Sequence, residues 1–569
     1  MLSAPSGGPK IAGREAVSGK CFDGVNGMRF WKKLKKNSSD EIWEEYCSFL
    51  DLTMDEYMEI QGRLLAEQVE LMSNCALGER FLHGQKPKTI EEFRKAVPLT
   101  RYEDYEDILL NKRADCLPGE PVVWLETTWE SGSRPKKLAP YTKQMLDVYT
   151  NNILAAMLLS TSTEKGHFRV KNGDRVLYGL APLPYATGLF PLLIAPEMDI
   201  RFMPSLKKAE HLSFSQQNKE GFKEAIKCGI DQFFGMSSVV FTITRNFSDF
   251  ISSGSFSIKN IFGCRLHMLF RFLRAKYVCS RDKRPMKPKD LWDLKGFVCV
   301  GTDTALFKPE IEEAWGRTPL EIHGGTETSC MGTETWSRNG LVFFPDNAFY
   351  EFIPKAEMLK NEADPSYVPR TYLMNELTAN EEYEIVLSVF KGGAFMRYRP
   401  GDMYRCISIT NSKDGIDIPQ FEYIDRVPSV IDIAGFTRIT KGSIEKVLEL
   451  SGLPAGQWFA LKEYDGDKRS FLHFYVELDE ANRRSAYLDE KIIKEHFSVY
   501  YKHYDHDYND LKKLLGIEPL SVTLMPVGTI DKFEESIGHK IRSINPPKQD
   551  VIELTKLLSE SDIRVGGGE

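Results

Sequence analysis

The stretch His323-Gly324-Gly325-Thr326-Glu327 places backbone amides, a hydroxyl and a carboxylate at one point of the chain. Thr326 offers a donor for a phosphate oxygen, and Glu327 offers an oxygen ligand for a hard cation. Magnesium in proteins is usually held by one or two carboxylates together with substrate phosphates. The pattern, a Gly-Gly turn ending in Thr-Glu, predicts a binding site for a nucleotide phosphate and its Mg²⁺. An ordinary polar turn is the alternative that these five residues leave open.

A second polar cluster lies upstream, in the run Thr127-Thr128-Trp129-Glu130-Ser131-Gly132-Ser133-Arg134-Pro135-Lys136-Lys137. It comes directly before the helical pattern predicted for residues 142–158. Hydroxyls and amides of Ser131, Gly132 and Ser133 would serve as donors to a triphosphate, with Lys136 and Lys137 as counter-charge. A solvated loop leading into a helix is the other interpretation.

Two further polar positions follow downstream at predicted strand ends. Residues 383–388 and 421–425 have strand patterns, and Asp402 lies in a turn between them. A carboxylate such as Asp402 can accept both hydroxyls of a ribose. Arg426 ends the second strand two residues before a proline, at a place that suits a hinge between domains.

These clusters occur in an order that resembles the auxin-conjugating acyl acid amido synthetase family, especially its bacterial members, within the superfamily of adenylate-forming enzymes. The resemblance spans most of the chain. Besides the clusters already quoted, it is carried by residues 97–105, 140–142, 229–239, 344–354, 397–402, 419–421 and 540–547.

The resemblance implies an ATP- and Mg²⁺-dependent enzyme that converts a carboxylic acid into an acyl-adenylate and transfers the acyl group to an amine. In this interpretation Thr326 donates to a phosphate oxygen and Glu327 binds the metal. Asp402 binds the ribose, and Arg426 orients it. Lys540, which precedes an Asn-Pro pair, would enter the site during adenylation on a mobile C-terminal domain. Lys532 and Lys548 are nearby alternatives for that role.

The phosphate loop departs from the family pattern, because Trp129 and Glu130 stand where small residues are typical. An unscreened glutamate beside a triphosphate would be repulsive. Two alternatives to an amido synthetase therefore stay open: an acyl-CoA ligase with a thiol acceptor, and a non-catalytic nucleotide- or acyl-binding homologue.

An apolar segment around Pro182 and Pro184 resembles the part of relatives that lies beside the acyl group. We assign five side chains to the substrate site: Tyr185, Phe190, Phe234, Met236 and His323. A pocket lined by Tyr185, Phe190, Phe234 and Met236 would suit an aromatic or medium-length acyl carboxylate. Ordinary core packing is the alternative for each ring alone. Gly301, at the end of another buried strand, is assigned to nucleotide binding because ligands of α/β sheets sit at such ends.

The periodicity predicts an α/β fold with two unequal parts. Residues 40–94 have a helical pattern, and strand and helix patterns then alternate through residue 320. We expect a disordered leader at 1–20, a large adenylate-forming domain with mixed sheets and helices at 21–426, a smaller mobile α+β cap at 427–560, and a disordered tail at 561–569.

Composition favours a cytoplasmic enzyme. The chain has 569 residues, a net charge of -7, and ten cysteines without a Cys-x-x-Cys pair, which argues against general nucleic-acid binding and a zinc ribbon. The longest apolar run is interrupted by prolines, so no stable membrane insertion is expected. A basic cluster at residues 29–36 is interpreted as a solvated helix face rather than a membrane or partner contact. The oligomeric state is left open.

Overall fold

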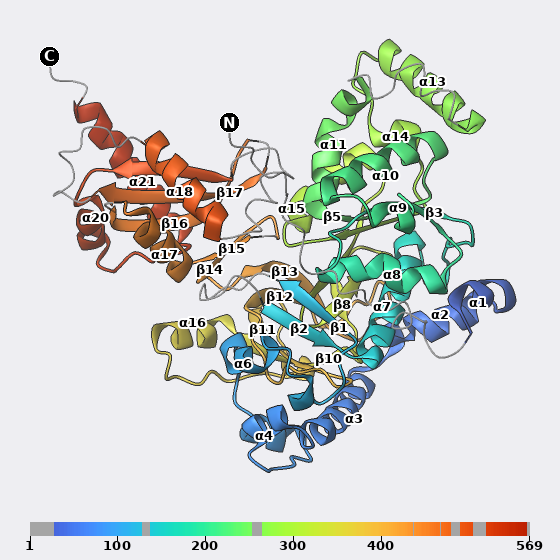
Figure 1. The fold of residues 1–569 in the computed structure, drawn as a ribbon, viewed down its shortest axis with the longest axis horizontal. Helices are drawn as coiled ribbons and strands as arrows, with labels where there is room; N and C mark the ends of the chain where they lie inside the picture. Colours follow the sequence, from blue (N-terminus) through green and yellow to red (C-terminus); the bar gives the residue numbers. More distant parts are fainter. Residues whose placement is uncertain are drawn as a thin grey trace, which may run out of the picture.

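The computed structural model describes residues 28–127, 137–252, 265–435, 437–453, 455–466, 468–478, 490–504 and 519–565. Figure 1 shows a large body and, beside it, a smaller C-terminal body coloured orange to red. The predicted α/β class is confirmed, because helices surround an 11-stranded mixed sheet and a second, smaller sheet stands apart from it.

Helices form the start of the described chain, as predicted for residues 40–94. Ser38 and Thr53 each cap a helix through a capping box, in which the Glu41 and Glu56 carboxylates accept a hydrogen bond from the backbone amide of the capping residue. The helices of this section are α1 Phe30–Lys36, α2 Ser39–Cys47, α3 Met54–Met72, α4 Ala76–Leu82, α5 Ile90–Ala96 and α6 Glu106–Leu109.

A short antiparallel hairpin, β1 Val123–Thr127 with β2 Lys137–Tyr141, flanks the predicted phosphate loop. The loop itself, with Ser131, Gly132, Ser133 and Lys136, lies outside the described residues. Thr142 then caps α7 Lys143–Thr161, which covers the helical pattern predicted for 142–158 and is buried along most of its length.

One half of the large sheet is parallel, in the order β7-β6-β5-β3-β4. Its strands are β3 Arg175–Gly179, β4 Arg201–Met203, β5 Gln232–Met236, β6 Gly296–Val300 and β7 Leu320–Gly325. The helices of this half are α8 Leu189–Glu197, α9 Leu206–Ala209, α10 Phe214–Cys228, α11 Ser237–Ser252, α13 Leu266–Arg281, α14 Pro288–Leu291 and α15 Thr304–Trp315. Parallel strands joined by helices bring their carboxyl ends to one edge of the sheet.

The other half is antiparallel and continues from β7 in the order β8-β9-β13-β12-β11-β10. Its strands are β8 Ser329–Glu334, β9 Leu341–Phe343, β10 Ala348–Pro354, β11 Glu382–Val389, β12 Asp402–Ser408 and β13 Gln420–Arg426, with α16 Lys355–Ala363 after β10. Strand β7 therefore lies where the parallel and antiparallel halves meet.

The C-terminal body has its own apolar core around Ile431, Ile439 and Phe474, and the largest core cluster of the main body ends at Tyr423. Its elements are β14 Val430–Ile433, β15 Thr437–Thr440, α17 Lys441–Ser451, β16 Ala455–Tyr464, β17 Ser470–Leu478, α18 Glu490–Tyr504, β18 Leu520–Met525, α20 Thr529–Ile537 and α21 Lys548–Val565. Helix α21 extends to Val565, so part of the segment expected to be a disordered tail is helical. The domain boundaries themselves stay predictions.

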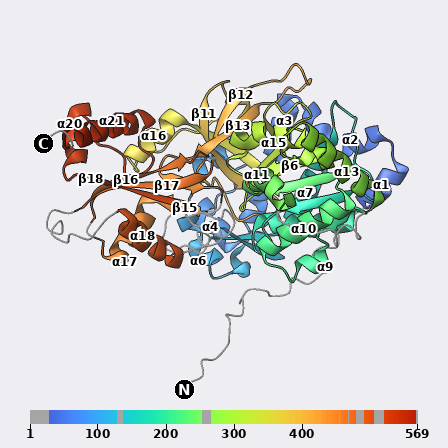
Figure 2. The same ribbon diagram turned by 90° about the horizontal axis from the view of Figure 1, so that it is seen from above.

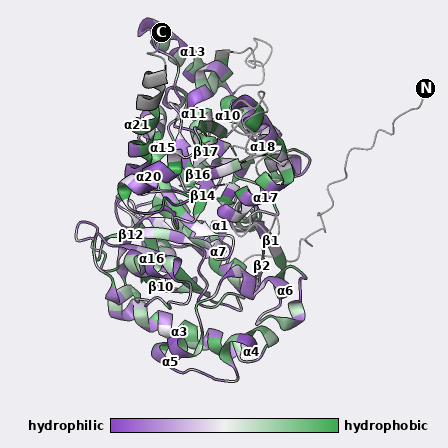
Figure 3. Ribbon diagram, turned by 90° about the vertical axis from the view of Figure 1, so that its left-hand side faces the viewer, coloured by the Kyte–Doolittle hydropathy of each residue, from purple (hydrophilic) through white to green (hydrophobic). Residues whose placement is uncertain are grey.

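The surface helices carry alternating hydrophilic and hydrophobic residues, as Figure 3 shows for the side of the C-terminal body. In the part of the chain that the structure describes, no helix has the length and apolar character needed to cross a membrane. The eight cysteines of this part are free thiols, and six of them are buried.

Candidate active site

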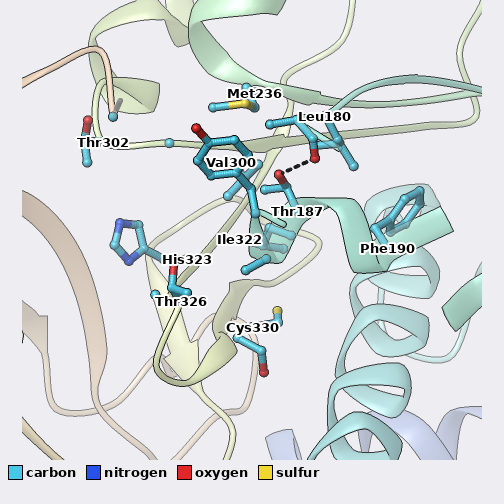
Figure 4. A pocket seen from close by; sticks show the side chains of 18 of the residues that line it. Leu180, Thr187, Phe190, Met236, Val300, Thr302, Ile322, His323, Thr326 and Cys330 are labelled. Carbon is cyan, nitrogen blue, oxygen red and sulfur yellow. Dashed lines mark hydrogen bonds between the residues drawn. The ribbon is translucent and has the colours of Figure 1, made fainter. Parts of the chain in front are cut away.

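A cavity of about 180 Å³ opens at the carboxyl ends of the parallel strands. Residues at or just after the carboxyl ends of β3, β5, β6 and β7 line it, and residues of β12, β13 and the β14–β15 hairpin complete it. Figure 4 shows His323, Thr326 and Thr302 on one side of this cavity, opposite Phe190 and Leu180. Gly301 was assigned to nucleotide binding because ligands of α/β sheets bind at strand ends. It lines this cavity together with the predicted site residues His323 and Thr326.

The far wall of the cavity is apolar. All four side chains predicted for the acyl group line it: Tyr185, Phe190, Phe234 and Met236. Phe190 from α8 stacks on Phe234 from β5, with ring centroids 4.5 Å apart and an interplanar angle of 23°. Leu180, Val300 and Ile322 add aliphatic surface from three strand ends. This half of the cavity suits an uncharged, flat or aliphatic group.

His323 lies between the two halves of the sheet and also lines the cavity. Its ring stacks on Tyr423 with centroids 4.3 Å apart, and its Nδ1 lies 2.6 Å from the Tyr404 hydroxyl. Burial first, and then the charge of Arg426, lower the pKa of His323 to about 3. The imidazole is therefore neutral at physiological pH and acts as a hydrogen-bonding and stacking group.

We expect the variant His323→Gln to lose less stability on acidification than the unchanged protein. The unfolded chain takes up a proton near pH 6.5 while the folded chain does not, since its pKa is about 3. The stabilisation is therefore complete above pH 6.5 and falls by about 1.4 kcal/mol per pH unit below it, or about 2 kcal/mol by pH 5. Urea unfolding at pH 7 and pH 5 measures the difference.

The matched control for that experiment is His211→Gln, because His211 is exposed on the surface. Its pH dependence should match that of the unchanged protein. Equal losses on acidification in all three proteins would contradict the role assigned to His323.

The Gly-Gly pair is not a turn, which corrects the sequence analysis. Gly324 and Gly325 are the last residues of β7 and pair with Cys330 and Ser329 of β8; the connection is formed by residues 326–328. A Cβ atom on Gly324 would lie 1.6 Å from the Ser329 carbonyl oxygen. Because β8 approaches so closely, glycine is required here for strand pairing. Both glycines and Thr326 still line the cavity.

Glu327 and Lys137 lie together beside Tyr398 and are not among the residues that line the cavity. The Tyr398 hydroxyl donates to Glu327 Oε1 at 3.0 Å, Lys137 Nζ donates to the Tyr398 oxygen at 3.1 Å, and Lys137 Nζ lies 3.9 Å from Glu327 Oε1. Both side chains are buried. The structure thus brings the two predicted ligands of phosphate and metal together, but pairs them with each other. Their contacts with triphosphate and Mg²⁺ stay predictions.

The opposite end of the cavity is charged. Asp402 and Arg426 face each other across β12 and β13, with Arg426 Nε 3.2 Å from Asp402 Oδ1. Arg426 Nη1 also donates to the Pro400 carbonyl oxygen at 2.8 Å, and the Tyr423 hydroxyl lies 3.4 Å from Asp402. These contacts hold the carboxylate toward the cavity, where a ribose hydroxyl can donate to it.

Comparison with known families identifies two of these regions. Residues 47–178 match the GH3 family N-terminal domain, and residues 341–426 match the GH3 family central domain. These two stretches of the chain belong to the GH3 family. This family stands within the adenylate-forming ANL superfamily, so the suspected resemblance is confirmed. A search of curated protein sequences gave no match for this GH3 chain.

Solved structures with a similar fold include a 2-hydroxyisobutyryl-CoA ligase in complex with 2-HIB-AMP and CoA. It is 16% identical, has a TM-score of 0.55, and the match covers 85% of the GH3 chain and 88% of the ligase. The AtGH3.15 acyl acid amido synthetase in complex with 2,4-DB is also 16% identical, with a TM-score of 0.48 and coverage of 89% and 95%.

Two charged residues of the GH3 chain that line the cavity were missed from the sequence. Asp432 of β14 accepts hydrogen bonds from the Thr302 hydroxyl at 2.8 Å and from the Gly435 amide at 2.9 Å, and Arg438 of β15 lies 4.0 Å from it. An aspartate within the apolar strand Val430–Ile433 was the available signal, since buried carboxylates need a partner or a function.

Lys540 does not lie at the cavity. Its side chain is 86% exposed and its Nζ is 2.7 Å from Glu534 Oε2, within the C-terminal body. Its predicted role requires a different placement of that body and stays a prediction.

Proposed function

We propose that this GH3 chain activates a small monocarboxylic acid with ATP and transfers the resulting acyl group to an amine, forming an amide. The observation that carries the proposal is the division of one cavity into an apolar wall and a charged end. The acid would place its hydrocarbon body against Phe190 and Phe234, with AMP toward Asp402 and Arg426. Family membership supports adenylate formation as the first step.

The cavity also limits the acid. The apolar wall shares the cavity of about 180 Å³ with the charged end, and a dry apolar cavity of about 150 Å³ already accommodates benzene. One aromatic ring or a medium-length chain is therefore the upper limit for the hydrocarbon body of the acid. The charged residues that line the described cavity are Asp402, Arg426, Asp432 and Arg438, all at its other end. A second carboxylate on the acid would therefore meet no cation at the apolar wall.

In the first half-reaction, a carboxylate oxygen of the acid attacks the α-phosphorus of ATP, and the bond to the β-phosphate oxygen breaks to release pyrophosphate. Thr326 lies where its hydroxyl can donate to a phosphate oxygen, and Asp402 can accept from the ribose hydroxyls. Ser131, Gly132, Ser133 and Lys136 belong to the loop proposed to bind the triphosphate. Gly301 lines the cavity and is proposed to contact the nucleotide.

Magnesium fits this site only as an ion held mainly by the nucleotide. Among the described residues, no group of three or more acidic, histidine or cysteine side chains is arranged to bind a metal. A single carboxylate, Glu327, is consistent with a Mg²⁺ that retains phosphate and water ligands. When bound, the ion would neutralise charge on the phosphates, while Lys137 and Tyr398 orient the Glu327 carboxylate.

In the second half-reaction, an amine nitrogen attacks the acyl carbon, the carbon–oxygen bond to AMP breaks, and the nitrogen loses a proton. The acceptor proposed is an amino acid. A thiol of CoA would use the same adenylate, and the structural likeness to a CoA ligase concerns the fold alone.

The test is acid-dependent pyrophosphate release from ATP and Mg²⁺ with a panel of aromatic and alkyl monocarboxylic acids, using hydroxylamine as a surrogate acceptor. We then compare amino acids and CoA as acceptors. Amide formation supports the proposal, and thioester formation alone assigns a CoA ligase. If no acid in the panel causes pyrophosphate release and calorimetry detects no ATP binding, the protein is a non-catalytic homologue.

We expect Met236→Trp to narrow the range of acids. Met236 lines the cavity at the end of β5, and a larger ring there would occupy space needed by the substrate. The kcat/KM for the bulkiest accepted acid should fall by about tenfold or more, while the smallest acid is barely affected. Leu359→Trp, on the partly exposed surface of α16, is the control. Equal losses for all acids would contradict the assignment of this wall to the acyl body.

A further inference from the structure

Helix α13 carries an apolar stripe on the surface of the protein. Leu266, Phe270, Leu273 and Tyr277 are 73%, 69%, 53% and 69% exposed. Their spacing of four, three and four residues places them on one narrow face of the helix. The opposite face, with Met268, Ala275 and Cys279, packs against the protein. The helix is thus oriented, and the stripe faces outward.

Cations flank this stripe. Residues 265–281 contain Arg265, Arg271, Arg274, Lys276 and Arg281 and no acidic residue, although the whole chain has a net charge of -7. With about 100° of rotation per residue, Arg274 and Arg281 fall on one side of the stripe and Lys276 on the other. Arg274 and Lys276 are exposed. A basic helix with large apolar side chains between its cations has the chemistry of a helix that lies in a lipid interface.

The position of α13 fits a flat, anionic partner. Figure 1 shows α13 projecting from the main body, and Figures 1 and 2 place it at the same end of the long axis as α1, opposite the C-terminal body. Helix α1 adds exposed Lys32, Lys35 and Lys36 at that end. Part of the basic cluster at 29–36 is structural, since Arg29 pairs with Glu197 and Lys33 with Glu45. The three lysines are exposed, and the Nζ atoms of Lys32 and Lys35 lie over the Trp31 ring.

We propose that α13 docks this protein reversibly onto an anionic lipid surface, with the four apolar side chains in the headgroup boundary and the cations on lipid phosphates and carboxylates. A stable protein partner takes roughly 20–30 residues from each side, far more than this stripe supplies. Binding to a bilayer needs only the apolar stripe and the attraction between the cations and anionic lipid. The inference is independent of the reaction proposed above.

The experiment is co-sedimentation of the full chain with vesicles of phosphatidylcholine, with and without phosphatidylserine. We expect binding to the anionic vesicles to exceed binding to neutral ones, and to weaken with salt. Phe270→Ser with Leu273→Ser removes the centre of the stripe, and Arg274→Gln with Lys276→Gln removes two flanking cations. Each pair should lower the partition coefficient by about tenfold or more.

Matched controls are Val368→Ser with Ile552→Ser, two exposed apolar residues elsewhere, and Lys88→Gln with Lys532→Gln, two exposed lysines elsewhere. These should bind like the unchanged protein, and all variants should keep its circular dichroism. Equal binding to neutral and anionic vesicles, or unchanged binding of both α13 variants, overturns the proposal. Loss of a lipid-free dimer in the Phe270 and Leu273 variant, without vesicle binding by the unchanged protein, would assign the stripe to self-association instead.

Discussion

Replacement of Lys540 by alanine is expected to slow acyl-adenylate formation by roughly a hundredfold or more. A cation delivered to the phosphate where charge develops stabilises the transition state, and loss of one such group typically costs about that factor. The step from preformed adenylate to amide should continue, because the role concerns attack on the α-phosphate only. Rapid-quench measurement of the pyrophosphate burst, followed by transfer from supplied acyl-adenylate, separates the two steps.

The fold should tolerate this change, since the Lys540 side chain is 86% exposed and its partner Glu534 belongs to the same body. Lys532→Ala and Lys548→Ala are the matched controls, because both lysines lie near Lys540 in the sequence and were the alternatives for its role. A pyrophosphate burst at the unchanged rate in the Lys540 variant would remove the assignment. A loss confined to either control would transfer it to that lysine.

Local patterns predicted the elements of the large body well. The buried strand predicted before Gly301 is β6, and the helical pattern predicted for residues 142–158 is α7, which Thr142 caps. These signals are local, so a single sequence contains them. The continuity of the sheet was not predictable, because β9 joins β13 through the pair Leu341 and Phe421, which lie far apart in the chain.

The candidate site was predictable to the extent that strand ends determine it. His323, Thr326, Asp402 and Arg426 line one cavity because their strands end at one edge of the sheet. The contact between Glu327 and Lys137 could not be predicted from the sequence, which assigned Lys137 to the triphosphate and Glu327 to Mg²⁺. Their mutual pairing through Tyr398 joins three segments that lie far apart in the chain.

Asp432 and Arg438 show a second limit. They belong to a hairpin of the C-terminal body, and they line the cavity only because that body docks on the main one. Docking depends on interdomain contacts that no local pattern reveals. For the same reason the sequence did not reveal the role of Lys462, which pairs with Asp303 of the main body.

Replacement of Lys462 by alanine is expected to release the C-terminal body from the main body. Lys462 of β16 is 7% exposed, and its Nζ lies 2.7 Å from Oδ1 of Asp303, the residue that precedes α15; the Tyr464 hydroxyl donates to the same oxygen at 3.0 Å. Burial alone would lower the pKa of Lys462, but Asp303, Asp425 and Asp432 raise it well above its usual value. The lysine is therefore charged and paired.

Removal of that cation leaves the Asp303 carboxylate buried without its main counter-charge, at a cost of about 3–5 kcal/mol. Separation of the two bodies returns the carboxylate to water, so we expect the undocked population to rise by roughly 10²–10⁴-fold. Small-angle scattering should show a larger radius of gyration. Amide transfer should slow more than adenylation, because the docked arrangement keeps Lys540 outside the cavity.

Two controls separate this ion pair from general damage to the interface. Lys468 pairs with Glu310 across the same interface at 2.8 Å, but it is 38% exposed, so Lys468→Ala should change docking by less than about 1 kcal/mol. The double variant Lys462→Met with Asp303→Leu removes both charges and should restore docking, because an apolar pair can replace a buried ion pair without loss. Unchanged scattering and unchanged transfer in Lys462→Ala would show that this pair does not hold the two bodies together.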